Sequence, residues 1–390
     1  MEITVHRGTH QIGGIATEIA TAKTRILIDM GEDLSPTPTP LQIPGVTDCN
    51  GTCDAVLFTH HHGDHIGQMG RICAEIPLYA GELAKEIMLM SAEHCCKKDD
   101  ALCSRIQTIR TFLPGVAFEI GNIRITPFSV DHSACDSYMF LLEAEGRRVL
   151  YMGDFRAHGF RGKALPKLLE KLVGKVDALV IEGTTLSRPK TPPMTERELQ
   201  QKVAAYMEQY PYVFVLCSST NLERICALSK SVPRGKYFVC DGYQSDLLDL
   251  LQRHWHGYSS LYCNLKKTVY GENLLPKLRE RGFLMTVRDN RAFRKIAGNF
   301  DPAKSIVLYS MWEGYRLQPD STIPDFLNLF GKWESLHTGG HAGCDDLRAV
   351  VEKVHPDVVI PVHTEVPEEF LPLCPNSKIL LPKDKEPIAL

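Results

Sequence analysis

Three imidazoles and a carboxylate fall within six residues of one loop, Thr59–Gly67, which has the sequence THHHGDHIG: His60, His62, Asp64 and His65. Imidazole nitrogens and carboxylate oxygens are ligands for divalent transition metals. In an extended chain, positions 60 and 62 point to the same side, whereas Asp64 and His65 can turn toward a second centre. The spacing therefore indicates a loop that donates to two divalent cations, rather than a solvated histidine-rich turn.

Several strands must deliver side chains to this loop. The apolar stretch Asp54–Phe58 indicates a buried strand that runs directly into it, and a helix opens behind it. A hairpin pattern covers residues 118–130, and the stretch DALVIEG indicates a further strand. Five strand patterns in all end in a polar residue that could join a metal site or simply form a turn: Asp29, His132, Asp154, Glu182 and His363.

With these motifs in order, the chain resembles the metallo-β-lactamase superfamily. The loop matches the superfamily's metal-binding loop, His132 its third motif, and the GDF sequence at Asp154 its fourth motif. Asp29 matches an aspartate that orients the loop from behind the ligands. The resemblance implies two divalent ions, with zinc as the expected metal and manganese as the alternative. It assigns one ion to His60, His62 and His132, the other to Asp64, His65 and His363, and a bridging position to Asp154.

Three later motifs narrow the resemblance to the β-CASP nucleases, most closely to the ribonuclease J form. They are Glu182 after its strand, HTGGHA at residues 337–342, and PVHTE at residues 361–365. The resemblance implies that His341 gives a proton to the leaving oxygen, that Glu182 orients it, and that His337 contacts substrate. Asp64 is counted with these catalytic residues as well as with the ligands. Within this group a histidine at the third motif, here His363, accompanies RNA enzymes.

The implied fold is α/β: a metallo-β-lactamase αββα sandwich with an inserted α/β β-CASP domain. We expect the first part of the sandwich at residues 1–189, the insert at 190–334 and a return segment at 335–390. Strand–helix alternation in the insert predicts a parallel sheet. The insert departs from known forms at YSMWEGY, residues 309–315, and the end of the chain at Leu390 predicts no ribonuclease J C-terminal domain.

The insert also carries the candidate substrate contacts. Ser218, Ser219 and Thr220 follow a strand and precede a helix, where hydroxyls and backbone N–H groups could hold an anion or simply cap the helix. Twenty Lys and Arg against fifteen Asp and Glu give residues 190–334 a net charge of about +5. Its basic run is either a solvated face or a track for backbone phosphates, and the candidates are Arg288, Arg291 and Arg294.

Composition narrows the setting. The net charge of −3 over 390 residues excludes an overall nucleic-acid-binding field. The thirteen cysteines are odd in number, and no signal peptide or long apolar run is present, so we expect reduced thiols, a cytoplasmic location and no membrane partner. Cys217 and Cys240 lie in apolar strand patterns and are expected in the core.

The sequence thus predicts a dinuclear-metal ribonuclease that leaves a 5′-phosphate and a 3′-hydroxyl, with RNA as its partner; the resemblance also allows a homodimer. The main alternative is a hydrolase of a small-molecule ester, lactone or phosphodiester, with the insert as a lid. A DNA nuclease and a non-catalytic RNA-binding subunit are lesser alternatives. Whether the enzyme cuts internally or from the 5′ end is not encoded in these motifs.

Overall fold

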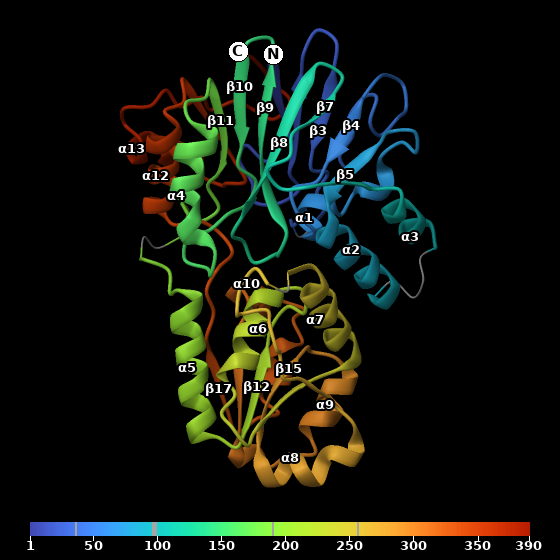
Figure 1. Ribbon diagram of the computed structural model, residues 1–390, viewed down its shortest axis with the longest axis vertical. Helices are drawn as coiled ribbons and strands as arrows, with labels where there is room; N and C mark the ends of the chain where they lie inside the picture. Colours follow the sequence, from blue (N-terminus) through green and yellow to red (C-terminus); the bar gives the residue numbers. More distant parts are fainter. Residues whose placement is uncertain (36, 96–99, 189–190, 256) are drawn as a thin grey trace. The chain divides into compact units, whose positions relative to one another are not determined.

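The computed structural model describes residues 1–35, 37–95, 100–188, 191–255 and 257–390. They form two compact units, drawn in Figure 1. Unit 1 comprises Met1–Pro192 and Gly340–Leu390, and unit 2 comprises Pro193–Gly339. Unit 2 takes the place of the insert that the sequence put at residues 190–334. The return to unit 1 at Gly340 means that His341 belongs to unit 1, together with every candidate metal ligand.

Unit 1 contains two mixed β-sheets. In the hairpin of the second sheet, Ile123 and Ile125 are buried while Arg124 between them is exposed, which is the alternation of a strand with one face in the core. The first sheet has the order β19 (Pro387–Ala389), β1 (Glu2–Arg7), β2 (Ala16–Ala20), β3 (Arg25–Ile28), β4 (Ala55–Leu57), β5 (Leu78–Gly81) and β6 (Arg110–Phe112). The second has the order β18 (Val358–Val362), β11 (Ala178–Glu182), β10 (Arg147–Tyr151), β9 (Ser137–Ala144), β8 (Ile123–Val130) and β7 (Phe118–Ile120).

Helices cover the outer face of each sheet. The two inner faces share one apolar core, in which Ile26 and Leu57 of the first sheet cluster with Phe140 and Val180 of the second. The first sheet is covered by α2 (Glu82–Cys95) and α3 (Asp100–Gln107), with the short α1 (Gly63–Ile66) and η1 (Met69–Arg71) before them. The second is covered by η2 (Gly162–Ala164), α4 (Leu165–Leu168), η3 (Leu169–Val173), α12 (Cys344–Val354), η6 (Pro367–Glu369) and α13 (Phe370–Leu373).

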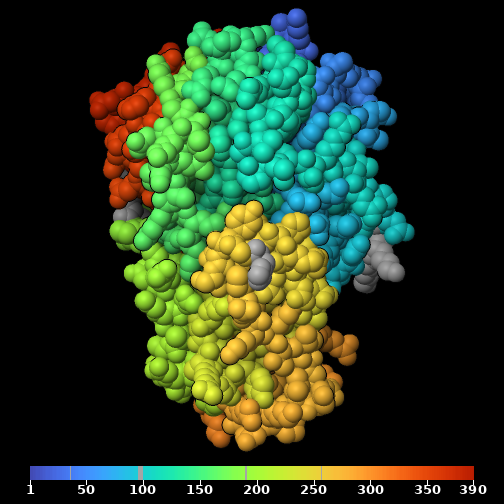
Figure 2. Space-filling view, in the orientation of Figure 1, coloured from blue at the N-terminus to red at the C-terminus, as the bar shows by residue number. Residues whose placement is uncertain are grey.

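These layers confirm the predicted αββα sandwich. The return segment supplies both a sheet strand, β18, and covering helices, and Leu347 of α12 packs in one cluster with Leu165 and Leu169. In Figure 2 its red atoms lie beside the green atoms of residues near α4. The second sheet and its helical layer are therefore completed by residues that lie more than 150 positions further along the chain than β11 and α4.

Unit 2 is built on a six-stranded sheet in which every pair is parallel, as predicted. The order is β14 (Thr268–Val269), β13 (Tyr237–Cys240), β15 (Phe283–Val287), β12 (Tyr212–Leu216), β16 (Ser305–Tyr309) and β17 (Lys332–Ser335). The helical elements are α5 (Glu196–Gln209), α6 (Leu222–Ser231), α7 (Gly242–Trp255), η4 (Glu272–Leu274), α8 (Leu275–Arg281), α9 (Arg291–Ala297), η5 (Pro302–Lys304), α10 (Glu313–Leu317) and α11 (Ile323–Leu327). Among the described helices of both units, none is long and apolar enough to span a bilayer.

The cysteines differ from expectation in one respect. Cys217 and Cys240 are buried free thiols, as predicted. Cys49 and Cys73, however, form a disulfide, so the expectation of reduced thiols throughout is wrong. The backbone N–H of Cys73 donates to the carbonyl of Val46, which brings the two segments together. The resulting Cα–Cα distance of 5.7 Å is in the range that a disulfide requires.

Candidate metal centre

The metal-binding loop is fixed from behind by Asp29. Asp29 follows β3 in the left-handed backbone region, with φ 63°. Its Oδ1 accepts from the Thr59 backbone N–H at 2.8 Å, and its Oδ2 accepts from the Thr59 hydroxyl at 2.8 Å. Oδ2 also accepts from His65 Nδ1 at 2.8 Å, which leaves His65 Nε2 as the nitrogen that faces the site. A hydrogen bond to one ring nitrogen thus sets which nitrogen is available for coordination.

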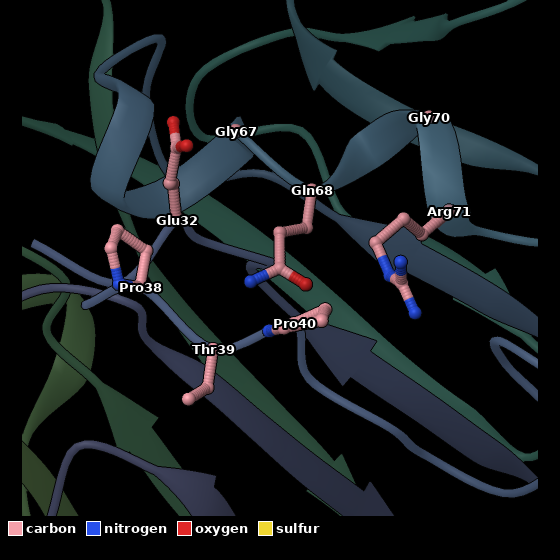
Figure 3. Close-up of a pocket in the computed structure, with 8 residues that line it drawn as sticks. All are labelled: Glu32, Pro38, Thr39, Pro40, Gly67, Gln68, Gly70 and Arg71. Atoms are coloured by element: carbon pink, nitrogen blue, oxygen red, sulfur yellow. The ribbon is translucent and has the colours of Figure 1, made fainter.

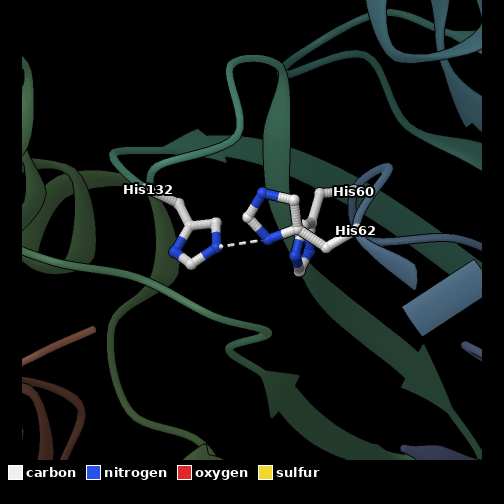
Figure 4. A group of neighbouring side chains, drawn as sticks. All are labelled: His60, His62 and His132. Atoms are coloured by element: carbon white, nitrogen blue, oxygen red, sulfur yellow. Dashed lines mark hydrogen bonds between the residues drawn. The ribbon is translucent and has the colours of Figure 1, made fainter. Parts of the chain in front are cut away.

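Three histidines form the first half of the cluster. His132 Nε2 and His62 Nδ1 are 3.2 Å apart, as Figure 4 shows, and the ring centroid of His60 lies 4.7 Å from each of the other two. His132 Nδ1 donates to the carbonyl of Gly340 at 2.6 Å. His60 Nε2 is buried and has no hydrogen-bond partner among the described residues. Three converging imidazole rings, one of which has a buried nitrogen without a partner among the described residues, fit a bound cation.

Carboxylates and two more histidines form the second half. Asp154 Oδ2 lies 3.2 Å from His65 Nε2, 3.8 Å from His363 Nε2 and 3.9 Å from His132 Nε2. His363 Nε2 is 3.3 Å from Asp64 Oδ2. The other nitrogen of His363, Nδ1, is 2.7 Å from the hydroxyl of Thr184. Asp154 therefore stands between the two histidine groups.

The pair Glu182 and His341 adjoins this second half. Glu182 is fully buried at the end of β11, and its Oε1 accepts from the Phe155 backbone N–H at 3.0 Å. Its Oε2 is 2.9 Å from His341 Nδ1, and the same nitrogen is 3.6 Å from Asp154 Oδ2. His341, which follows the return of the chain into unit 1, is thus held by one carboxylate and lies within reach of another.

These contacts define three groups, and within each group the ligand atoms lie within 4.8 Å of one another; the second and third groups share Asp154 and His363. The groups are His60, His62 and His132; Asp64, His65, Asp154 and His363; and Asp154, Glu182, His341 and His363. The first two fit a site for two metal ions. The third shows that Glu182 and His341 have the geometry of ligands as well as that of a proton-transfer pair.

The charges in the two halves differ. Burial lowers the pKa of His62 to about 4, and burial together with neighbouring imidazoles holds the pKa of His60 and of His132 well below the usual range. These rings are neutral at pH 7, with nitrogen lone pairs free to bind a cation. Burial alone would lower the pKa of His65, but the carboxylates of Asp154, Asp29 and Asp64 raise it instead. The half of the cluster that contains the carboxylates therefore favours a positive charge, either a protonated histidine or a bound cation.

Several supporting groups were not found from the sequence. The Thr59 hydroxyl lies within 3.3 Å of ring nitrogens of both His60 and His65, and the Thr184 hydroxyl supports His363. The Gly340 carbonyl supports His132. Each residue lies next to or within a motif, and that proximity is the only sequence signal. His61 is buried too, and burial lowers its pKa to about 3.

The remaining predicted residues all lie in unit 2. The Ser219 hydroxyl accepts from Arg288 at 2.7 Å, and Ser218 Oγ is 3.1 Å from Thr220 Oγ1. His337 Nδ1 accepts from Arg224 at 3.2 Å. Arg288 forms an ion pair with Asp241, and Arg294 donates to Asp289 at 2.8 Å. Arg291 is exposed at the start of α9. Two of the three candidate phosphate-binding arginines thus have a carboxylate partner.

A cavity of about 290 Å³ opens beside the metal-binding loop but is lined by none of its ligands. Figure 3 shows Gln68 in its wall, with Glu32 and Arg71 to either side. Gln68 Oε1 accepts from the Leu41 backbone N–H at 2.8 Å, so its amide ties the segment around Leu41 to the end of the metal-binding loop. None of the candidate metal ligands lines this cavity, so the chemistry lies in the histidine cluster instead.

Two comparisons with known proteins concern the family and the fold of this chain. Residues 24–211 match the family model described as Beta-lactamase superfamily domain. This stretch of the chain, a little under half of it, is therefore similar to a β-lactamase superfamily domain, in agreement with the motifs around the metal-binding loop. A solved protein of unknown function from Enterococcus faecalis V583 shares the fold, with a TM-score of 0.80 at 20% identity; the match covers all of this chain and 99% of that one.

Curated relatives narrow the comparison. An RNase J-like protein of Methanocaldococcus jannaschii is 26% identical over 220 residues, which is 52% of this chain and 48% of the relative. Ribonuclease J of Helicobacter pylori 26695 is 22% identical over 394 residues, 94% of this chain and 56% of the relative. The chain spans about half the length of these relatives. Their names are consistent with the β-CASP resemblance of the motifs.

Proposed function

We propose that this protein is a metal-dependent ribonuclease that hydrolyses RNA to products with a 5′-phosphate and a 3′-hydroxyl. The observation that supports it most is the Glu182–His341 pair beside Asp154. Hydrolysis of an activated ester needs hydroxide alone, but release of a ribose 3′-oxygen benefits from a proton donor. The names of the curated relatives, ribonuclease J and RNase J-like protein, point to the same substrate.

The metal ligands we propose are His60, His62 and His132 for one ion, Asp64, His65 and His363 for the other, and Asp154 for both. The donor set of imidazoles and carboxylates suits zinc, and the carboxylate half also suits manganese. When bound, two such cations would act as Lewis acids and lower the pKa of water toward neutrality. Asp29, Thr59 and Thr184 keep the ligand rings in the orientation that coordination requires.

His341 is the proposed proton donor. Its Nδ1 is held by Glu182, which leaves Nε2 to donate to the leaving oxygen. Burial opposes its protonation, but the carboxylates of Glu182 and Asp154 raise the pKa of His341 above the ordinary value. A raised pKa favours the protonated ring, which is the state that a general acid needs.

A hydrolase of a small-molecule ester, lactone or phosphodiester is the second candidate. The observation in its favour is that Arg288 and Arg294, expected to bind RNA phosphates, already have carboxylate partners. The proposed location is the cytoplasm. The Cys49–Cys73 disulfide is unusual for a protein of a reducing compartment.

Turnover of end-labelled single-stranded RNA, compared with a thioester, a lactone and bis-p-nitrophenyl phosphate, separates the two candidates. We expect RNA to be cleaved with the highest kcat/KM, and the labelled fragments to carry 5′-phosphates. Preferred turnover of the lactone or thioester, with intact RNA under the same metal conditions, would transfer the proposal to the small-molecule class. The fragment pattern also separates internal cleavage from stepwise 5′ removal.

A further inference from the structure

Unit 2 exposes three large aromatic side chains around one short helix. Trp312 is 46% exposed, Tyr315 43% and Trp333 37%. Trp312 and Tyr315 belong to the sequence MWEGY at α10, and Trp333 lies in β17. We call these three rings and Arg316 the aromatic platform. Exposed aromatic surface gathered in one place indicates a binding surface rather than scattered apolar residues.

The platform is held in shape before any ligand arrives. A Cβ placed on Gly314 would lie 2.3–2.4 Å from three ring carbons of Trp312, so the indole rests directly on the backbone of this glycine. The Tyr309 hydroxyl donates to the carbonyl of Trp312 at 2.7 Å. The rings of Trp312 and Tyr315 meet edge to face, with centroids 5.4 Å apart and an interplanar angle of 84°. In this arrangement the edge of one ring meets a face of the other, and 46% of Trp312 and 43% of Tyr315 remain exposed to solvent.

Arg316 adds a cation to the platform. Its guanidinium lies 5.3 Å from the ring centroid of Trp333, in a cation–π arrangement. Its Nε donates to Glu313 Oε1 at 2.7 Å, which fixes the side chain along α10. The platform thus combines aromatic rings with an ion-paired arginine. This mixture suits a planar polar ligand better than it suits the apolar surface of a partner protein.

The position of the platform in the sheet points the same way. Trp312 lies three residues beyond the carboxyl end of β16. Ser219, which follows β12, and Arg288, which follows β15, lie at the same edge and are hydrogen-bonded to each other. In open parallel sheets, ligands bind at the carboxyl edge. Residues 193–339 hold nineteen Lys and Arg against fifteen Asp and Glu, a net +4, which favours a polyanion.

We propose that the aromatic platform binds single-stranded RNA by stacking its bases on Trp312 and Tyr315. The inference rests on the proposed function, because it takes RNA as the substrate, and it adds a base-binding surface to the substrate contacts that were expected in this unit. Stacking on aromatic rings tolerates every base, since each base has a π-face. The surface would give affinity without sequence preference.

Tryptophan fluorescence offers a direct readout, because all three tryptophans of the chain, Trp255, Trp312 and Trp333, lie in unit 2. A short oligouridylate is titrated into protein kept in chelator, so that no cleavage occurs, and an abasic ribose-phosphate oligomer of equal length serves as the backbone probe. We expect quenching by the oligouridylate. Trp312→Ala should weaken its binding about tenfold, within the range for loss of one stacked base, and leave abasic binding unchanged.

Two further variants keep the result interpretable. Trp312→Phe retains a ring and should retain most of the affinity, while Leu317→Ala removes a 65% exposed apolar side chain from the same helix and should change affinity less than twofold. Oligouridylate affinity within twofold of wild type for both Trp312→Ala and Tyr315→Ala would overturn the platform. So would an equal loss on the abasic probe, or a change in oligomeric state that marks the surface as a protein contact. RNA turnover by the wild type tests the nuclease proposal separately.

Discussion

The histidine cluster of unit 1 and the arginine run of unit 2 were both candidate sites, and the structure treats them differently. In the cluster, side chains from residues 60 to 363 form three groups, and within each group the ligand atoms lie within 4.8 Å of one another. In the run, Arg288 and Arg294 turn to Asp241 and Asp289 of their own unit. The cluster contains a buried ring nitrogen of His60 that has no hydrogen-bond partner among the described residues, whereas two of the three candidate arginines are already paired with carboxylates.

The difference shows which sequence signals specify a site. The seven proposed metal ligands have few arrangements that satisfy them, because neutral buried imidazoles that face one another favour a bound cation. An arginine in a charge run has many ways to be satisfied, and a nearby carboxylate is the commonest. The number of charged residues in a segment therefore indicates its overall electrostatic potential but does not identify the arginines that bind phosphates.

Removing the shared carboxylate should have the largest effect. Asp154→Ala takes away the oxygen between the two histidine groups, so we expect fewer than two ions per chain and activity reduced to the level of chelated protein. Metal analysis of the purified variant beside RNA turnover checks this. Asp131→Asn, at a buried carboxylate that pairs with Arg156, is the control for loss of fold. Unchanged metal load and activity in Asp154→Ala would refute the dinuclear assignment.

Replacing His341 should have the next largest effect. His341→Ala should keep both ions and lose RNA cleavage by about 10²–10⁴-fold, the usual contribution of a general acid. Its loss on a p-nitrophenyl ester should be much smaller, because p-nitrophenolate departs without a proton. His363→Ala is the matched comparison and should lose metal and both activities. A His341→Ala protein that lacks an ion would make this residue a ligand instead, in line with the third group of neighbouring side chains.

Unit 2 contains one buried ion pair that should matter more to stability than its surface arginines. Arg224 and Glu196 are both fully buried, and Arg224 also donates to the carbonyls of Ser310 and Thr338. Arg224→Ala removes the cation that pairs with the buried Glu196 carboxylate, and breaking a buried ion pair costs about 3–5 kcal/mol. Urea unfolding followed by tryptophan fluorescence reports this unit. A double variant, Arg224→Leu with Glu196→Leu, should recover much of the loss; if Arg224→Ala costs under about 1 kcal/mol, well short of a broken buried pair, the pair is not structural.

The smallest effect separates two arginines of the basic run. Arg291 is exposed and has no ion-pair partner in the described parts of the chain, whereas Arg294 is held by Asp289 and by the Thr322 carbonyl. Arg291→Ala should weaken RNA binding and reduce the slope of log affinity against log salt by about 1, as expected for one phosphate contact. Arg294→Ala should leave the slope unchanged. If both variants show the same salt-dependence slope as wild type, Arg291 does not bind a backbone phosphate, and the proposed phosphate track is wrong.

The sequence was sufficient where chemistry is local. The loop THHHGDHIG and the strand ends at His132, Asp154 and His363 could be recognised because their residue types and order are restrictive, and the αββα layers followed from the same resemblance. Pairings that depend on tertiary register could not be predicted. The Cys49–Cys73 disulfide and the Arg224–Glu196 pair join segments whose proximity no local pattern encodes. The same holds for Thr184, which supports His363 from 179 residues away.

The central claim is that the cluster around Asp154 holds two divalent ions that make RNA hydrolysis possible. Metal-free protein titrated with Zn²⁺, and separately with Mn²⁺, while cleavage of 5′-labelled single-stranded RNA is followed, tests it most directly. We predict that activity rises to a plateau at two ions per chain and that the fragments carry 5′-phosphate and 3′-hydroxyl ends. A plateau at one ion, or no RNA cleavage at any metal loading while a small ester is turned over, would contradict the account.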